Sequence, residues 1–273
     1  MALARGDASQ YFKRHSSSPE PLVFSKKSTI SLSMSSEAVL VAFYLFMLVY
    51  SVILHEVAHG VVAYWLGDLT AKYAGRITLS PWSHVDPLGS FIIPVALFVT
   101  TGFAFGYAKP VPYNPYNLRD QKWGPLYVAL AGPATNFLLA FIGAFLASVL
   151  PLSLLAKQDI LGRFLGIISG RGEFLERFEL LATAMAGSFS SIFFGLLLFL
   201  IFWNVVLGCF NLLPIPPLDG SKILFTFFPV KEKAQFQLEQ YGFFLLLFII
   251  FVFSAPLSAF ISAFLRFFFG LTM

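Results

Sequence analysis

Residues 38–59, AVLVAFYLFMLVYSVILHEVAH, join a long apolar run to a short group with two histidines and a glutamate. The apolar part, residues 38–54, contains no charged side chain. Continued to about residue 67 as a helix, the segment reaches roughly 45 Å, which exceeds the hydrocarbon core of about 30 Å. The sequence therefore predicts a membrane-spanning helix that carries polar residues in its later half.

The rest of the chain has the same apolar character. Of its 273 residues, 58% are hydrophobic and only 12% are charged, against about 25% charged in soluble domains. Further apolar runs at residues 91–105, 189–202 and 243–253 indicate segments that lie in the hydrocarbon core of a membrane. A soluble single-domain enzyme is excluded. The expected fold is an all-α polytopic membrane protein with five to six transmembrane helices, placed as a multi-pass protein in a prokaryotic plasma membrane.

Net charge and composition also limit which partners and which domain division can be expected. The net charge of +4 is modest and no basic patch interleaves with aromatics, so the lipid bilayer is an expected partner and nucleic acid is not. Residues 1–36 are basic and rich in serine, which predicts a disordered tail. Residues 37–273 are expected to form the transmembrane domain. No regulatory domain is visible in the chain.

One segment of the domain has a β-like pattern. Residues 71–79, AKYAGRITL, alternate partly between apolar and polar side chains, and the turn-rich residues 80–89 follow. This pattern predicts a short membrane-associated β-strand or hairpin.

The polar group on the first helix has the spacing of a metal site. His55 and His59 are separated by four residues, which places both imidazoles on one helix face, and Glu56 lies beside them as a candidate base. The single cysteine, Cys209, excludes a multi-cysteine site. Ionisable groups in an apolar helix are costly and mark functional sites. The alternative is that hydrogen bonds inside a helix bundle satisfy these side chains.

A zinc site of this kind needs a third protein ligand. Asp219 is the candidate, because it lies in the proline-rich residues 211–220, NLLPIPPLDG, directly after an apolar helix. Unwound backbone at membrane depth is tolerated where it is buried in protein or lines a cavity. The alternative is that Asp219 and Gly220 form an exposed turn.

These two motifs together resemble the site-2 protease family of intramembrane zinc metalloproteases, peptidase family M50. That family pairs HExxH with NxxPxPxLDG, and every fixed position of the second motif is present: Asn211, Pro214, Pro216, Leu218, Asp219 and Gly220. Residues 74–79, 84–89, 106–115 and 131–136 are similar to compact members that lack a PDZ domain. The resemblance covers about residues 52–224.

The resemblance implies an intramembrane zinc endopeptidase that acts on transmembrane-helix proteins in regulated intramembrane proteolysis. One Zn²⁺ per chain would be held by His55, His59 and Asp219. Zinc lowers the pKa of a bound water to about 7, and Glu56 would take its proton and pass it to the leaving amine. Asn136 and Asn211 are candidates to stabilise the oxyanion, although either side chain would equally serve to cap helix backbone.

A peptide bond inside a helix must unwind before it can be cleaved, so something must hold the substrate extended. The expected strand offers an edge for this, with Gly75, Arg76 and Ile77 as substrate-binding residues. Alternatively, the strand only seals the mouth of the site. His84 would orient a ligand or the substrate, or lie at the surface in a turn.

Two other functions use the same residues. A metal-ion transporter or channel would use His55, His59 and Asp219 as a permeation site, because buried ionisable groups also mark ion pathways. A catalytically inactive protein that binds membrane helices is the second alternative. The transporter gives Glu56 no necessary role, and the inactive protein is at odds with the presence of Glu56 and all three candidate ligands. The sequence does not name the substrate.

Overall fold

The computed structural model describes residues 26–101, 106–170, 173–228 and 230–273. Every regular element in this part of the chain is a helix, and turns and extended segments join the helices. The predicted all-α fold is confirmed. Helix α1 begins at Lys26, so its first turns lie in the segment that was predicted to be a disordered tail. Residues 1–25 of that tail lie outside the described residues.

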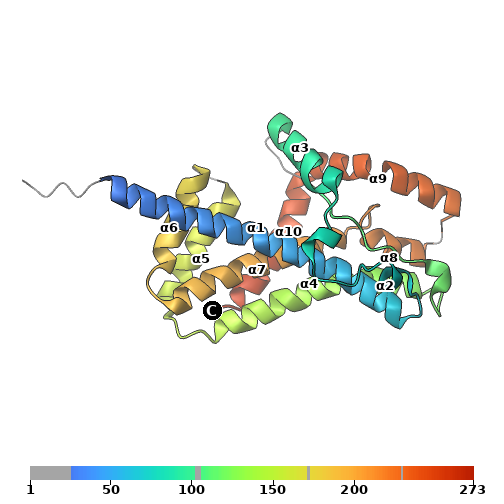
Figure 1. Cartoon of the computed structure of the whole chain (residues 1–273), viewed down its shortest axis with the longest axis horizontal. Helices are drawn as coiled ribbons and strands as arrows, with labels where there is room; N and C mark the ends of the chain where they lie inside the picture. Colours follow the sequence, from blue (N-terminus) through green and yellow to red (C-terminus); the bar gives the residue numbers. More distant parts are fainter. Residues whose placement is uncertain (1–25, 102–105, 171–172, 229) are drawn as a thin grey trace, which may run out of the picture.

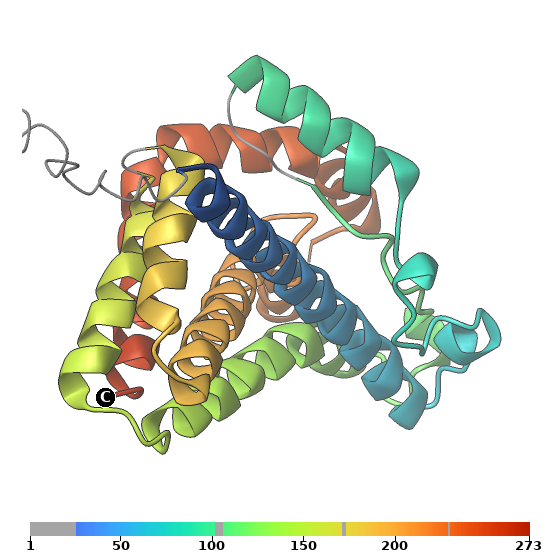
Figure 2. The ribbon, with the colours of Figure 1, turned by 60° about the vertical axis from the view of Figure 1, so that its left-hand side comes forward.

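Three helices form the centre of the molecule: α1 (Lys26–Trp65), α4 (Gly124–Ser148) and α7 (Phe189–Asn211). They pack against one another in pairs, and Figure 2 shows α4 and α7 side by side beneath the long α1. Gly143 of α4 permits close approach, because a Cβ atom there would lie 3.1 Å from Ile201 of α7. Helix α1 is therefore packed against two helices, α4 and α7, that are distant from it in the sequence.

One end of the bundle is covered by α5 (Leu154–Ser169) and α6 (Phe174–Met185), whereas α10 (Ser254–Gly270) packs against α7 and α4 (Figure 1). The core at this end is aromatic, with Phe164 and Phe178 packed around Phe199. The buried Lys157 of α5 donates to the carbonyl oxygens of Ser148 at 2.8 Å and Thr272 at 3.1 Å, near the C-terminal ends of α4 and α10. A cation there satisfies carbonyls that the helices leave unpaired.

Four helices of the described chain are long and apolar enough to cross a membrane: Ser36–Trp65, Gly124–Ser148, Phe189–Asn211 and Lys233–Val252. The last belongs to α9 (Glu232–Val252). The prediction of five to six spans counted two further segments, which form the shorter helices α3 (Ile93–Thr101) and α10. Helix α3 continues directly from a π-helical turn at Leu88–Ile92, and residues 102–105 after it lie outside the described residues. The chain is a multi-pass membrane protein, as predicted.

The β-strand predicted at residues 71–79 is wrong. Its first residues belong to the short helix α2 (Thr70–Tyr73), and Gly75 follows with a left-handed φ of 64°. The amide of Arg76 then donates back to the carbonyl oxygen of Ala71 at 2.9 Å. Residues 71–76 therefore close a turn instead of pairing with a second strand, and a lone strand would lack a partner.

A proline-rich segment, extended up to Asn114 and ending in a 3-10 turn at Pro115–Asn117, crosses the end of α1. We call residues 109–117, KPVPYNPYN, the strap. The strap is fixed to the end of α1 by Asp68, which is fully buried. Its carboxylate accepts hydrogen bonds from the amide of Asn114 at 2.7 Å and the side chain of Asn117 at 3.0 Å. The backbone and hydroxyl of Thr70, at the start of α2, donate to the same carboxylate.

The charge of Asp68 should stabilise the fold in a pH-dependent way. Burial raises its pKa, but hydrogen bonds from Thr70, Asn117 and Asn114 outweigh burial and hold the pKa below its usual value of 3.8. A lowered folded pKa contributes stability that is present above the unfolded pKa and is lost as the pH falls through the folded pKa.

We therefore expect Asp68→Asn to lower the melting temperature of the detergent-purified protein at pH 7 by about 5 °C. The difference from wild type should shrink as the pH falls below 3.8. Asp159→Asn, at an exposed position of α5, controls for the loss of one charge. Thermal unfolding measured between pH 7 and pH 3 checks both; a difference that does not depend on pH would contradict the electrostatic explanation.

Candidate metal site

The predicted histidine pair forms on α1. His55 and His59 are both buried, and their Nε2 atoms lie 3.1 Å apart. The Oδ2 atom of Asp219 lies 3.1 Å from Nε2 of His55 and 3.4 Å from Nε2 of His59. One ligand atom from each of the three residues falls within 4.8 Å of the others. The structure thus brings together the three side chains that the sequence singled out.

Asp219 is placed by the break that follows α7. The helix ends at Asn211, and Asp219 precedes α8 (Gly220–Phe227). A Cβ atom at Gly220 would overlap the carbonyl oxygens of Leu212 and Leu213, so only glycine lets the chain fold back this tightly. The side chain of Asp219 is 22% exposed. The alternative of a fully exposed turn does not describe this conformation.

Hydrogen bonds on the far side of each imidazole fix how the two rings face Asp219. Nδ1 of His55 lies 2.6 Å from the Oδ1 atom of Asn136. Nδ1 of His59 lies 2.7 Å from the carbonyl oxygen of Val128. Both partners are on α4 and both are acceptors, so each Nδ1 carries the proton and each Nε2 presents a lone pair. This is the arrangement of metal-binding histidines.

The donor set fits a zinc ion. Two Nε2 lone pairs and a carboxylate oxygen point at one another without a donor between them. In agreement with this, Oδ2 of Asp219 is buried and has no hydrogen-bond partner among the described residues. A cation satisfies all three atoms at once. Two imidazoles and one carboxylate, with a fourth position left open for water or substrate, are the ligand set of catalytic zinc sites.

A buried chain of hydrogen bonds extends from His55 through three helices. The amide of Asn136 donates to Oδ1 of Asn204 on α7 at 2.8 Å. Asn204 donates in turn to the hydroxyl of Ser51 on α1 at 2.8 Å. Asn136 and Asn204 are fully buried. The sequence reasoning missed Asn204, although an asparagine inside the apolar residues 189–211 was a detectable signal.

The two predicted oxyanion residues have different surroundings. Both ends of the Asn136 side chain are engaged, by His55 and by Asn204. Asn211 donates to the carbonyl oxygen of Leu207 at 3.0 Å, one turn back on α7, which is the helix-capping geometry left open above. The oxyanion role of each residue stays a prediction.

Glu56 follows His55 and is partly buried. Its Oε2 atom accepts a hydrogen bond from the backbone amide of Val111, in the strap, at 2.9 Å. The predicted substrate-binding residues lie near the same strap. Arg76 is buried and donates to the carbonyl oxygen of Lys109 at 2.7 Å, Ile77 packs at Gly60 of α1, and Gly75 is exposed in its turn.

Two further polar residues lie near the strap. His84 is buried rather than at the surface, and its Nε2 lies 2.8 Å from the carbonyl oxygen of Thr78. Burial, followed by the charges of Glu239 and Asp219, raises the pKa of Tyr113 to about 12. The sequence reasoning did not single out Tyr113.

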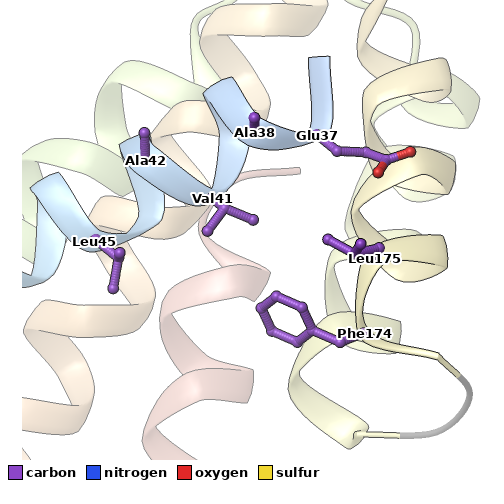
Figure 3. Close-up of a pocket in the computed structure, with 7 residues that line it drawn as sticks. All are labelled: Glu37, Ala38, Val41, Ala42, Leu45, Phe174 and Leu175. Atoms are coloured by element: carbon purple, nitrogen blue, oxygen red, sulfur yellow. The ribbon is translucent and has the colours of Figure 1, made fainter. Parts of the chain in front are cut away.

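A separate apolar groove lies between the start of the first span in α1 and the start of α6 (Figure 3). Its lining residues are Glu37, Ala38, Val41, Ala42, Leu45, Phe174 and Leu175. None of them belongs to the metal cluster, which lies several helical turns further along α1. The site is therefore not in this groove.

Comparison with known proteins identifies the class. The model of peptidase family M50 matches residues 43–253. "Putative zinc metalloprotease YwhC" of Bacillus subtilis (strain 168) is 38% identical over 207 residues, covering 74% of this chain and 78% of the relative. "Putative zinc metalloprotease Rip2" of Mycolicibacterium smegmatis is 27% identical over 194 residues, covering 71% of this chain and 60% of that relative. No solved structure matches.

The chain therefore belongs to peptidase family M50, and the predicted family is confirmed. It is a zinc metalloprotease of the site-2 protease type, embedded in the membrane by several helices. Zinc is its cofactor, and His55, His59 and Asp219 lie close enough together to bind the ion. The bacterial relatives agree with the predicted prokaryotic membrane.

Gly132 of α4 allows the ligand rings to reach their positions. A Cβ atom at this residue would lie 2.5 Å from the His55 ring and 2.6 Å from Nε2 of His59. We expect Gly132→Ala to displace both imidazoles and to weaken zinc binding by about 10–100-fold. Gly162→Ala, in open space on α5, is the matched control. Zinc per chain after dialysis against a graded chelator checks this, and equal retention by both variants would contradict it.

Asn204 should act on zinc through Asn136 and His55. Replacing Asn204 by alanine leaves the Asn136 amide without its acceptor, so the ring of His55 loses its fixed orientation. We expect Asn204→Ala to weaken zinc binding by about 10–100-fold. Asn211→Ala, the same change on the same helix, should not weaken it. Chelator competition measures both, and equal zinc affinities of the two variants would contradict a role for the hydrogen-bond chain.

Proposed function

We propose that this protein is an intramembrane endopeptidase that hydrolyses peptide bonds in or near transmembrane segments of membrane-protein substrates. The observation that carries the proposal is the cluster of His55, His59 and Asp219 beside Glu56 on a membrane-spanning helix. A peptidase site at this place meets substrates that are themselves embedded in lipid. Regulated intramembrane proteolysis is the process in which such a site would act.

In this proposal His55, His59 and Asp219 hold zinc, and Asn136 and Val128 orient the imidazoles. When bound, zinc supplies Lewis acidity, which lowers the pKa of water and polarises the scissile carbonyl. Glu56 accepts the proton of the attacking water and returns it to the leaving amine. Because the Asn136 amide is occupied by two partners, we assign it to orienting His55. Asn211 remains the candidate donor to the oxyanion.

The substrate must present an extended backbone, because a helix hides its peptide bonds in its own hydrogen bonds. Residues 71–76 form a helical turn and residues 71–79, which include Gly75, Arg76 and Ile77, contain no strand, so capture by β-augmentation is not part of the proposal. We retain these three residues as candidates for contact with the substrate because Ile77 packs onto α1 at Gly60, one turn after Glu56.

Glu56→Gln is the decisive variant. We expect it to retain one zinc per chain and to lower the cleavage rate of a model transmembrane substrate by about 10²–10⁴-fold, the usual contribution of a general base. Glu176→Gln, an exposed acid on α6, should cleave like wild type. Zinc content and cleavage are measured on the same detergent-purified samples.

The same experiment separates the competing functions. Zinc bound in both proteins with equal cleavage would remove Glu56 from the chemistry. Zinc without any cleavage in wild type would favour a metal-ion transporter or an inactive helix-binding protein. A chain that binds no zinc would contradict the assignment of the three ligands.

A further inference from the structure

The Glu56 carboxylate is held by the backbone of the strap, which is remote from it in sequence. The strap contains Pro110 and Pro112, neither of which has an amide hydrogen. The amide of Val111 between them is therefore the one backbone donor in that stretch, and it points to Oε2 of Glu56 at 2.9 Å. A hydrogen bond from a neutral amide to a carboxylate is charge-assisted and directional.

The strap is fixed on both sides of this bond. On one side the carbonyl oxygen of Lys109 accepts from Arg76 at 2.7 Å. On the other side the amide of Asn114 donates to Asp68 at 2.7 Å. Anchors two residues before and three residues after Val111 leave its amide little freedom to turn away. The residue before a proline is also restricted to extended conformations.

Packing brings the strap close enough to α1 for this contact. Gly60 lies four residues after Glu56, so both are on one face of the helix. A Cβ atom at Gly60 would lie 3.0 Å from Cγ1 of Val111 and 3.3 Å from Ile77, so a larger residue would push the strap outward. Val111 as a whole residue is only 6% exposed. Its amide and its side chain thus contact α1 one helical turn apart.

We propose that the strap is a positioning element for catalysis, in which the Val111 amide fixes the rotamer of Glu56 and Asp68 holds the strap in register. The inference rests on the proposed function of Glu56 as proton carrier. Among the described residues, none donates a hydrogen bond to Oε1 of Glu56. One carboxylate oxygen is anchored, and the other remains free to take the proton. A displacement of about 1 Å at such a group costs roughly 100-fold in rate.

Val111→Pro tests the amide, because it removes the N–H group and keeps an apolar side chain in an already extended segment. We expect kcat to fall about 10–100-fold, with KM within about twofold of wild type and zinc still bound. Val111→Ala keeps the amide and removes packing against Gly60, so it should lower the melting temperature while reducing kcat much less than Val111→Pro does. Equal losses of kcat in the two variants, or full activity of Val111→Pro, would overturn the proposal.

Hydrogen exchange of the full chain gives a readout that does not depend on cleavage. In peptides covering residues 109–113, Glu56→Ala should remove the protection of the Val111 amide, whereas Glu56→Gln keeps an acceptor and should preserve most of it. Equal exchange in wild type and Glu56→Ala would overturn the contact itself. Because exchange needs no substrate, a wild type that shows no cleavage refutes the proposed function separately from this result.

Discussion

The meeting of two imidazole nitrogens and one carboxylate oxygen is the constraint on which the rest of this structure depends. At membrane depth, ionisable groups without partners cost several kcal/mol, so His55, His59 and Asp219 are stable there only together or around a cation. Bringing them together requires the break after α7 to fold back beneath α1. The tight turn at Gly220 and the packing of α1, α4 and α7 follow from that requirement.

The residues that orient the metal ligands extend well beyond the three ligands. Helix α4 supplies an acceptor for each Nδ1 atom, and Gly132 leaves the space that the two rings need. His55 and Asn204 engage both polar atoms of the Asn136 amide, and Asn204 in turn donates to Ser51, so the amide is satisfied in an otherwise apolar core. The result is a site in which helix α1 carries two ligands, the break after α7 carries the third, and the strap contacts Glu56.

Sequence reasoning succeeded where local geometry was enough. The spacing of His55 and His59 determines a shared helix face, and the proline-rich break at Asp219 signals backbone that must be buried in protein. It failed at residues 71–79, because partial alternation does not reveal that Gly75 takes a left-handed conformation and closes a turn. Of the five to six predicted spans, four are long apolar helices among the described residues, and the other segments form the shorter helices α3 and α10.

The sequence by itself determined that the protein lies in a membrane, that its fold is all-α, and which residues are the three candidate ligands and the candidate base. Composition and helical periodicity are local properties, so the sequence alone reveals them. Only the tertiary structure decided which atoms orient these residues. The bond from Asn136 to Asn204 and the bond from Val111 to Glu56 join residues 68 and 55 positions apart. Such contacts depend on how helices pack and where the strap crosses α1, and no local pattern of residues encodes those distances.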